Sequence, residues 1–207
     1  MFKILIKEMD MSSDEIKQKI IITAIECIES EGFQNVTVRK IADRAGVNVA
    51  AINYHFGSKE QLLQIAMNAT LNESFVNNIN DYEEMWQSNT KQALQLFLED
   101  TMEGAINYPN LTKAHLSDAF NNNNFSTNSV QRINEFLTDL HELIKNILYS
   151  NNEMESKLAV MQLFSVFMMT SMMTGLFDQF LGIDLKTAEN QKLFIEVLLK
   201  NYLKSSS

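Results

Sequence analysis

Hydrophobic residues recur at intervals of three and four positions along most of this chain, which is the spacing of one face of an α-helix. The first hydrophobic stripe predicts a helix over residues 13–31, which ends where Gly32 interrupts the pattern. This stripe consists of Ile16, Ile20, Ala24, Cys27 and Ile28. Because Cys27 lies on the stripe, we interpret it as a core residue, and redox sensing is the alternative.

The other helical patterns are separated by short polar breaks. They predict helices over residues 58–79, 90–107, 111–120, 130–147, 154–181 and 187–203. Proline occurs once, and four of the six glycines fall where helical patterns end. The chain is therefore predicted to be all-α, with enough residues for one or two domains.

Residues 37–63 contain two short helices joined by a tight turn. The first opens at Thr37, a residue type suited to an N-cap, and ends at Gly46, where a positive φ favours glycine. The predicted buried faces consist of Ile41, Ala42 and Ala45 on the first helix and Val47 and Ile52 on the second. This arrangement is the helix-turn-helix pattern, whose second helix enters the major groove of DNA.

The second helix ends in the run Tyr54-His55-Phe56-Gly57-Ser58-Lys59-Glu60. Ser58 and Gln61 have the spacing of a capping box, which predicts that another helix begins there. Over residues 16–71 the sequence resembles the N-terminal DNA-binding domain of the TetR family of transcriptional regulators. The Tyr-His-Phe run followed by Ser-Lys-Glu and two leucines is among that family's most specific signatures. Beyond residue 71 the resemblance is one of helical architecture and length.

The resemblance implies roles for individual residues of this stretch. Thr37 and Lys59 resemble the family's phosphate contacts at two helix starts, where backbone N–H groups also face the anion. Tyr54 resembles the aromatic residue that binds phosphate from the end of the recognition helix. His55 either does the same or packs against the first helix. Arg39 matches a position that reaches a base edge or a phosphate, and its planar fork suits guanine.

The exposed face of the recognition helix is predicted to comprise Asn48, Val49, Ala50, Ala51 and Asn53. Val49 and the two alanines suit contact with thymine methyl groups, and Asn53 suits adenine or a phosphate. For Ala50 and Ala51 we prefer the alternative that they provide steric clearance. This face has few long hydrogen-bond donors, so it does not identify the operator sequence.

The net charge of the chain is −9, which is the opposite sign to that expected of a nucleic-acid binder. Residues 33–60, however, include four basic and two acidic side chains, a net charge of +2 that leaves −11 for the rest. Lys40 and Arg44 contribute to this count, although both could be solvated surface charges. The asymmetry predicts a positive DNA-facing surface on an otherwise acidic protein.

We predict two domains. Residues 1–57 form the helix-turn-helix DNA-binding domain, within which residues 1–11 are a disordered arm or an extension, with a basic arm in the minor groove as the alternative. Residues 58–207 form a larger C-terminal domain for effector binding and dimerisation. A small-molecule effector that tilts the helix beginning at Ser58 would couple ligand binding to DNA binding in the way usual for the family.

Residues 158–177 carry no charged side chain over twenty positions, which by length alone qualifies as a membrane span. Polar residues dilute the stretch, so we instead expect a helix covered by its own domain and by a second copy of the chain. The resemblance implies that the last two long helices pair across a two-fold axis in a homodimer. The predicted interface comprises Leu158, Met161, Gln162, Ser165, Met169, Met173, Phe194 and Leu198.

Bulky apolar residues of the middle helices are the candidates for an effector pocket: Trp86, Phe97, Met102, Tyr108, Phe120, Phe136, Phe164, Met168 and Met172. Ordinary core packing is the alternative for each of them. A lining of this kind favours a hydrophobic small molecule. His115 and His141 could add polar groups, but the sequence shows no partner for either.

The sequence lacks the motifs of the common enzyme classes, including G-x-S-x-G, the P-loop and H-E-x-x-H. We therefore expect no catalysis, metal or cofactor. The partners expected are double-stranded operator DNA, a second copy of the chain and the effector, and no membrane. The single cysteine and the lack of a secretory signal indicate the cytoplasm, with nucleoid association when bound to DNA. The alternative function is that of a helical enzyme or interaction protein that has lost DNA binding.

Overall fold

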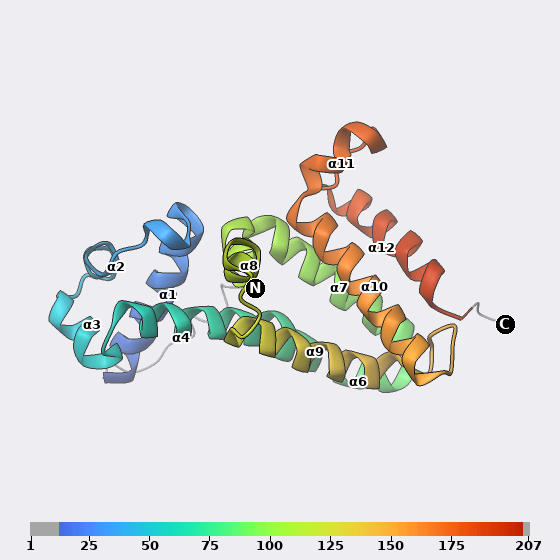
Figure 1. Cartoon of the computed structure of the whole chain (residues 1–207), viewed down its shortest axis with the longest axis horizontal. Coiled ribbons are helices and arrows are strands. Elements are labelled where there is room, and N and C mark those ends of the chain that lie inside the picture. The colour runs from blue at the N-terminus through green and yellow to red at the C-terminus, as the bar shows by residue number, and fades with distance from the viewer. Residues whose placement is uncertain (1–12, 205–207) are drawn as a thin grey trace. The chain divides into compact units, whose positions relative to one another are not determined.

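The computed structural model describes residues 13–204 of the chain, apart from the side chains of Ser13 and residues 76–78. The expected arm or extension at residues 1–11 lies outside this range. The fold of the described residues is all-α, as predicted, and their only β-type pairing is an isolated bridge between Leu148 and Leu203 (Figure 1). The elements are α1 (Ser13–Glu31), η2 (Phe33–Asn35), α2 (Val38–Ala45), α3 (Val49–Phe56), α4 (Lys59–Leu71), η3 (Asn72–Asn77), α5 (Asn78–Asn80), α6 (Glu83–Ser88), α7 (Thr90–Asn107), α8 (Pro109–Asn122), α9 (Asn128–Ile144), α10 (Glu153–Met172), α11 (Thr174–Leu181) and α12 (Ala188–Tyr202).

The chain folds into two compact units that are not consecutive in sequence. The first, here called the head unit, combines the chain up to Glu73 with Tyr108–Val130. The second unit combines Ser74–Asn107 with the chain from Gln131 onward. The polypeptide crosses between the units three times: within the π-helical segment η3, between α7 and α8, and near the start of α9. The predicted functional division at residues 57 and 58 stays a prediction, because these units are defined by packing alone.

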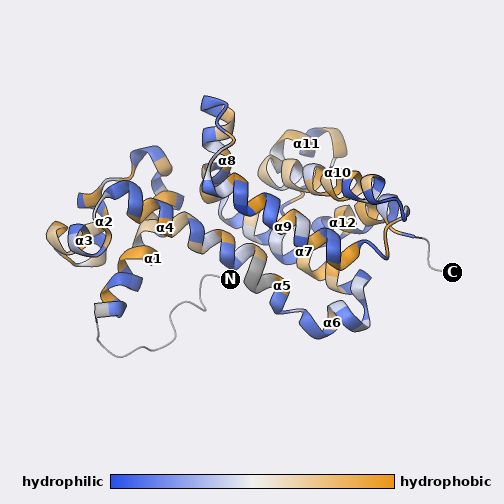
Figure 2. Cartoon of the chain, turned by 60° about the horizontal axis from the view of Figure 1, so that its bottom comes forward, coloured by the Kyte–Doolittle hydropathy of each residue, from blue (hydrophilic) through white to orange (hydrophobic). Residues whose placement is uncertain are grey.

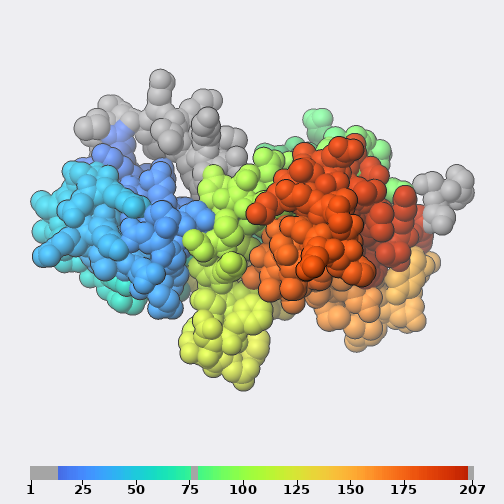
Figure 3. Space-filling model, turned by 90° about the horizontal axis from the view of Figure 1, so that it is seen from above, coloured from blue at the N-terminus to red at the C-terminus, as the bar shows by residue number. Residues whose placement is uncertain are grey.

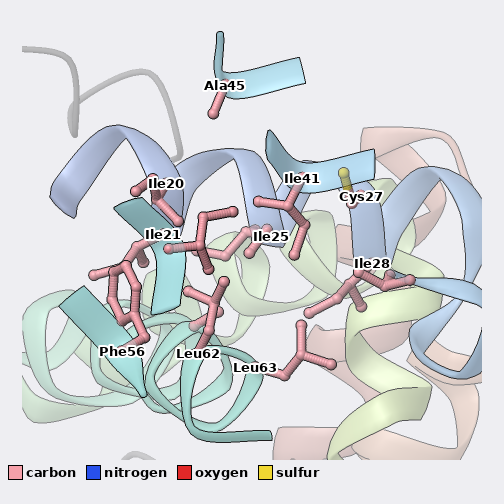
Figure 4. Packing of buried hydrophobic residues seen from close by; sticks show 14 of the residues in the cluster. Ile20, Ile21, Ile25, Cys27, Ile28, Ile41, Ala45, Phe56, Leu62 and Leu63 are labelled. Atoms are coloured by element: carbon pink, nitrogen blue, oxygen red, sulfur yellow. The ribbon is translucent and has the colours of Figure 1, made fainter. Parts of the chain in front are cut away.

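The core of the head unit gathers around α1. The hydrophobic stripe of α1 meets residues of α2, α3 and α4, as the close view in Figure 4 shows for Ile41, Phe56 and Leu62. Cys27 is fully buried in this core, and burial raises the pKa of its thiol, which favours its interpretation as a packing residue.

Helix α8 belongs to the head unit because its first turn is bound to α1. The Glu29 carboxylate accepts hydrogen bonds from the backbone N–H groups of Leu111 at 2.9 Å and Asn110 at 3.4 Å. The Asn110 side chain in turn donates to the Glu29 carbonyl at 2.7 Å. Leu111 itself is buried in the head core. An acidic side chain of α1 therefore satisfies the otherwise open N-terminus of α8.

The second unit is organised around α7, which packs against α6, α10 and α12. Its centre is an aromatic cluster in which the Phe136 ring stacks on Phe75 at 4.2 Å and on Phe97 at 5.7 Å between ring centroids. Farther along α9, the His141 Nε2 lies 2.8 Å from the Ser156 hydroxyl. These contacts join α9 to α7 and to α10.

The helix predicted over residues 154–181 is wrong in one respect, because it breaks at Met173. The N–H of Met173 still bonds to the carbonyls of Met169 and Thr170, but α11 then departs at 90° from α10. No single helix among the described residues is long and apolar enough to cross a membrane. The bent pair α10 and α11 passes that test only when taken together, by length and composition (Figure 2 shows their hydropathy).

Candidate nucleic-acid interface

Helix α2 begins and ends at the residues that the sequence indicates. The Thr37 side chain accepts a hydrogen bond from the backbone N–H of Lys40 at 3.3 Å, which makes it the N-cap. Gly46 adopts the left-handed conformation, with φ 66° and ψ 34°, and its N–H bonds to the carbonyls of Ala42 and Asp43. Helix α2 is therefore bounded by a capping hydroxyl at its start and by a left-handed glycine at its end, where the tight turn of the helix-turn-helix begins.

Helix α3 turns one face inward and leaves the other to solvent. Ile52 and Phe56 are buried against the head core. On the outer face of α3 and its N-cap, the residues exposed to solvent are Asn48, Val49, Ala50, Asn53 and Tyr54. The surface of α2 and α3 is in view in Figure 3 (blue and cyan). The sequence-predicted contact residues of this helix therefore share one accessible face.

Asn48 has a structural role that the sequence reading did not assign. Its side chain accepts a hydrogen bond from the backbone N–H of Ala51 at 2.7 Å and is the N-cap of α3. Asparagine is a favoured N-cap residue, and its place directly before the second helix of the pattern is the sequence signal for this role. The remaining atoms of the Asn48 amide stay at the surface.

The last two predicted contacts are Lys59, at the start of α4, and His55, near the end of α3. Ser58 is the N-cap of α4, and its hydroxyl accepts a hydrogen bond from the Gln61 N–H at 3.1 Å. The second hydrogen bond of a capping box, from the Ser58 N–H to the Gln61 side chain, is not formed, because the Ser58 N–H donates to the Phe56 carbonyl. Lys59 follows at the first helical position and is half-buried. His55 is also half-buried, and its ring meets that of Tyr54 edge to face at 5.1 Å.

The basic side chains of the head unit differ in how free their charges are. Lys40 and Arg44 both pair with Glu31, Arg44 at 3.2 Å, and the hydrogen bond from Lys40 holds the pKa of Glu31 below its usual range. Among residues 13–204, neither Arg39 nor Lys59 forms such an ion pair. Within residues 33–60, the positive charge available to an anion is therefore concentrated at Arg39 and Lys59 rather than spread over all four basic side chains.

The candidate effector residues do not all lie together. Trp86, Phe97, Phe136 and Phe164 meet in the aromatic cluster, and Met102 is buried in the same unit. Met168 and Met172 are half-buried on α10.

Two of these candidates belong elsewhere. Tyr108 packs against the head core, and Phe120 is 72% exposed at the end of α8. An exposed ring cannot line an enclosed cavity.

The candidate interface residues of α10 form an accessible stripe. Leu158, Met161, Met169 and Met173 are between 44% and 50% exposed, and Gln162 and Ser165 are exposed beside them. On α12 Phe194 is half-buried, and Leu198 is only 5% exposed because it faces the core of its own unit. Leu193 and Val197, which the sequence reading passed over, are the accessible apolar residues of that helix.

The two histidines without evident partners in the sequence both have them in the structure. His115 contacts Thr70 and Ser129, and His141 contacts Ser156. Thr70 lies 45 positions before His115, so no local pattern could have indicated the pair. Within residues 13–204 no group of three His, Cys, Asp or Glu side chains is placed to hold a metal ion.

The family model described as bacterial regulatory proteins of the tetR family matches residues 20–65. Among curated proteins, the HTH-type transcriptional dual regulator CecR of Shigella flexneri is 43% identical over 54 residues, which cover 26% of this chain and 24% of that protein. The sequence match thus spans about a quarter of that relative's length.

Likeness in structure extends over nearly the whole chain. A TetR transcription regulator from Haloarcula marismortui has a TM-score of 0.68 at 19% identity, covering 92% of this chain and 100% of that one. A transcriptional regulator from Saccharomonospora viridis, solved in complex with choline, has a TM-score of 0.68 at 13% identity, covering 93% and 100%. At these identities the likeness shows a shared fold.

Proposed function

We propose that this chain, whose head matches the TetR family of transcriptional regulators and whose fold is shared with them, binds a palindromic operator as a homodimer. The observation that carries the proposal is the exposed face of α3, together with the charges of Arg39 on α2 and of Lys59 at the start of α4, neither of which is ion-paired within residues 13–204. An α-helix with an accessible polar face fits the major groove, and nearby cations bind the phosphates beside it.

DNA footprinting over the region upstream of the protein's own gene tests this proposal. We expect a protected site with two half-sites about one helical turn apart. Arg39→Ala should weaken binding by about 1–3 kcal/mol, because it removes a free guanidinium from the interface. Lys40→Ala is the matched control, since its charge is already paired with Glu31. Equal losses in both variants, or no protected site anywhere in the genome, would contradict the proposed interface.

We propose that the homodimer forms through α10 and α12. The exposed stripe of Leu158, Met161, Met169 and Met173 supports this assignment, because a soluble protein rarely leaves such a surface uncovered. Met169→Glu would place a charge in the middle of the interface, and we expect it to convert the dimer to a monomer in sedimentation velocity. Thr138→Glu adds the same charge to an exposed position of α9 and should leave the dimer intact.

The remaining parts of the proposed function follow the family. We propose repression of transcription as the output and release from the operator by a small molecule as the regulation. The Saccharomonospora viridis structure with choline supports ligand binding on this fold. The family's regulators act as DNA-binding proteins, and we propose no enzymatic activity and a cytoplasmic location at the nucleoid. A reporter gene placed behind the footprinted operator should be expressed more strongly when the regulator gene is deleted, whereas reduced expression would indicate an activator.

A further inference from the structure

A cleft of about 400 Å³ lies within the head unit, between the first turns of α4 and the middle of α8. Phe33 and Gln34 of η2 and the residues at the start of α9 complete its walls. Its apolar part is formed by Leu63 and Met67 of α4 and by Ala114 of α8. The volume falls at the lower end of the range of small-molecule sites. All of its lining residues belong to the unit that carries the recognition helix.

The Nδ1 atom of His115 is a hydrogen-bond acceptor in this cleft, because the partners of the ring determine its tautomer. The Thr70 hydroxyl donates its one hydrogen to the Met67 carbonyl at 2.8 Å, so it accepts from the His115 Nε2–H at 2.9 Å. Burial lowers the pKa of His115 to about 4, which leaves the ring neutral at pH 7. The lone pair of Nδ1 then accepts from the Ser129 hydroxyl, at a long 3.3 Å. A ligand N–H or O–H could replace that hydroxyl.

Uncharged polar groups dominate the rest of the cleft. The side-chain amides of Gln34, Gln64 and Asn68 line it and form no side-chain hydrogen bond with any other residue of the described chain. Its charged groups are Lys59, Glu60 and Asp118, and the Asp118 carboxylate already accepts from Asn122 at 2.6 Å and from Asn124 at 2.8 Å. This lining combines an apolar floor with neutral donors and acceptors, and it has a small negative net charge.

We propose that the α4–α8 cleft binds a small neutral aromatic molecule that carries an amide or hydroxyl group, and that its occupancy changes the affinity of the protein for DNA. An aromatic ring fits against Leu63, Met67 and Ala114, while its polar group reaches the His115 Nδ1 and the free amides. The effect on DNA binding rests on the proposed function; the binding of the molecule does not.

The position of the cleft provides a direct connection to the DNA-binding surface. Its α4 wall begins at Lys59, three residues after α3 ends at Phe56. Its α8 wall is attached to α1 through Glu29 and Leu111. A ligand that bridges α4 and α8 therefore restrains α4, which packs against α3, and acts through α8 on α1, which packs against α2 and α4. Such a ligand favours one orientation of the recognition helix over the others.

Three probes of nearly equal shape test the proposed ligand class: benzamide, which is neutral, benzoate, an anion, and benzamidine, a cation. Binding to the purified full-length protein is measured by ligand-observed NMR titration in the absence of DNA. We expect benzamide to bind with a dissociation constant on the order of 1 mM, as suits a fragment of this size. Benzoate should bind at least tenfold more weakly. Tighter binding of benzoate or benzamidine than of benzamide would overturn the neutral ligand class.

Substitutions on both walls test the location. Ser117→Phe fills the cleft from α8 and Gln64→Trp fills it from α4, where the side chain is exposed and the fold tolerates a larger residue. Each should weaken benzamide binding at least tenfold. Ala119→Phe adds the same ring to α8 at a position that does not line the cleft, and it should bind benzamide as the native chain does. Unchanged binding in both cleft-filling variants, with thermal unfolding showing that they fold, would overturn the site.

The DNA effect is measured separately on the footprinted operator. We expect 10 mM benzamide to change operator affinity at least threefold in the native chain and in Ala119→Phe, but not in Ser117→Phe. Benzamide binding without any change in affinity would overturn the regulatory part of the proposal. If the protein protected no DNA, the proposed function would fail, and the titration without DNA would still decide whether the cleft is a ligand site.

Discussion

Replacement of Glu29 by alanine is the sharpest test of how α8 is held in the head unit. The substitution removes the carboxylate that accepts from the Leu111 N–H at 2.9 Å, together with a weaker bond to Asn110 at 3.4 Å. Loss of an N-capping acceptor costs about 0.5–2 kcal/mol, and loss of a negative charge at a helix N-terminus costs about 0.3–1 kcal/mol. The two effects overlap, so we expect a loss of about 1–2 kcal/mol. Glu29→Gln keeps an acceptor without the charge and should lose about half as much.

The assay for this prediction must report on the head unit separately. The single tryptophan, Trp86, lies in the second unit, so its fluorescence follows the unfolding of that unit. Amide hydrogen exchange of α8 reports directly on the contact between Glu29 and the first turn of α8, here called the clasp. We expect the amides of the first two turns of α8 to exchange about fivefold to thirtyfold faster in Glu29→Ala. Glu26→Ala is the matched control, because Glu26 is exposed on the same helix. Equal exchange of α8 in the two variants would refute the clasp as a stabilising contact.

Three further substitutions test other parts of the fold. Burial holds the pKa of His115 at about 4, below the value of about 6.5 in an unfolded chain, so the unfolded state binds the proton first as the pH falls. The free energy of unfolding should therefore be highest above pH 6.5 and should fall by up to about 3 kcal/mol between pH 6.5 and pH 4. Urea titrations of His115→Gln should show a smaller fall over the same pH range. Phe136→Ala should destabilise the second unit by about 3–5 kcal/mol by tryptophan fluorescence, because three aromatic rings lose a partner, whereas Phe136→Leu should cost clearly less. Gly46→Ala should cost about 1–2 kcal/mol in thermal unfolding through its positive φ alone, since the added methyl would meet only the Lys19 Nζ at 4.0 Å; a loss above 3 kcal/mol would indicate a clash that the structure does not contain.

Local signals in the sequence predicted the parts of the candidate interface that depend on a few neighbouring residues. Thr37, Gly46 and Ser58 each act within four positions of themselves, as caps or as a turn, and the structure confirms all three. The helices α1 and α7 begin and end where the hydrophobic pattern places them. Such features are readable because the chain itself brings the interacting groups together.

Features that depend on tertiary contacts could not be predicted from the sequence. Glu31 pairs with Lys40 nine positions later, so two of the four counted cations are already neutralised. The cleft around His115 is likewise assembled from segments distant in sequence.

The break at Met173 was hidden for a different reason. Met173 itself is neither proline nor glycine, and the hydrophobic pattern continues through it, although Gly175, a residue type that weakens a helix, lies two positions later. A helix can end wherever packing favours a new direction, even without a breaking residue.

The contacts of α8 change how a signal would have to travel in this protein. In the sequence, the helix that begins at Ser58 was the evident connection between the DNA-binding head and the rest of the chain. The structure adds a contact within the head unit, because Glu29 and Leu111 attach α8 directly to α1. A shift of α8 alone therefore acts on the scaffold helix of the head, and a shift of α4 acts on the end of α3. A ligand that touches both helices stabilises one arrangement of the two, which is the requirement for coupling between two sites.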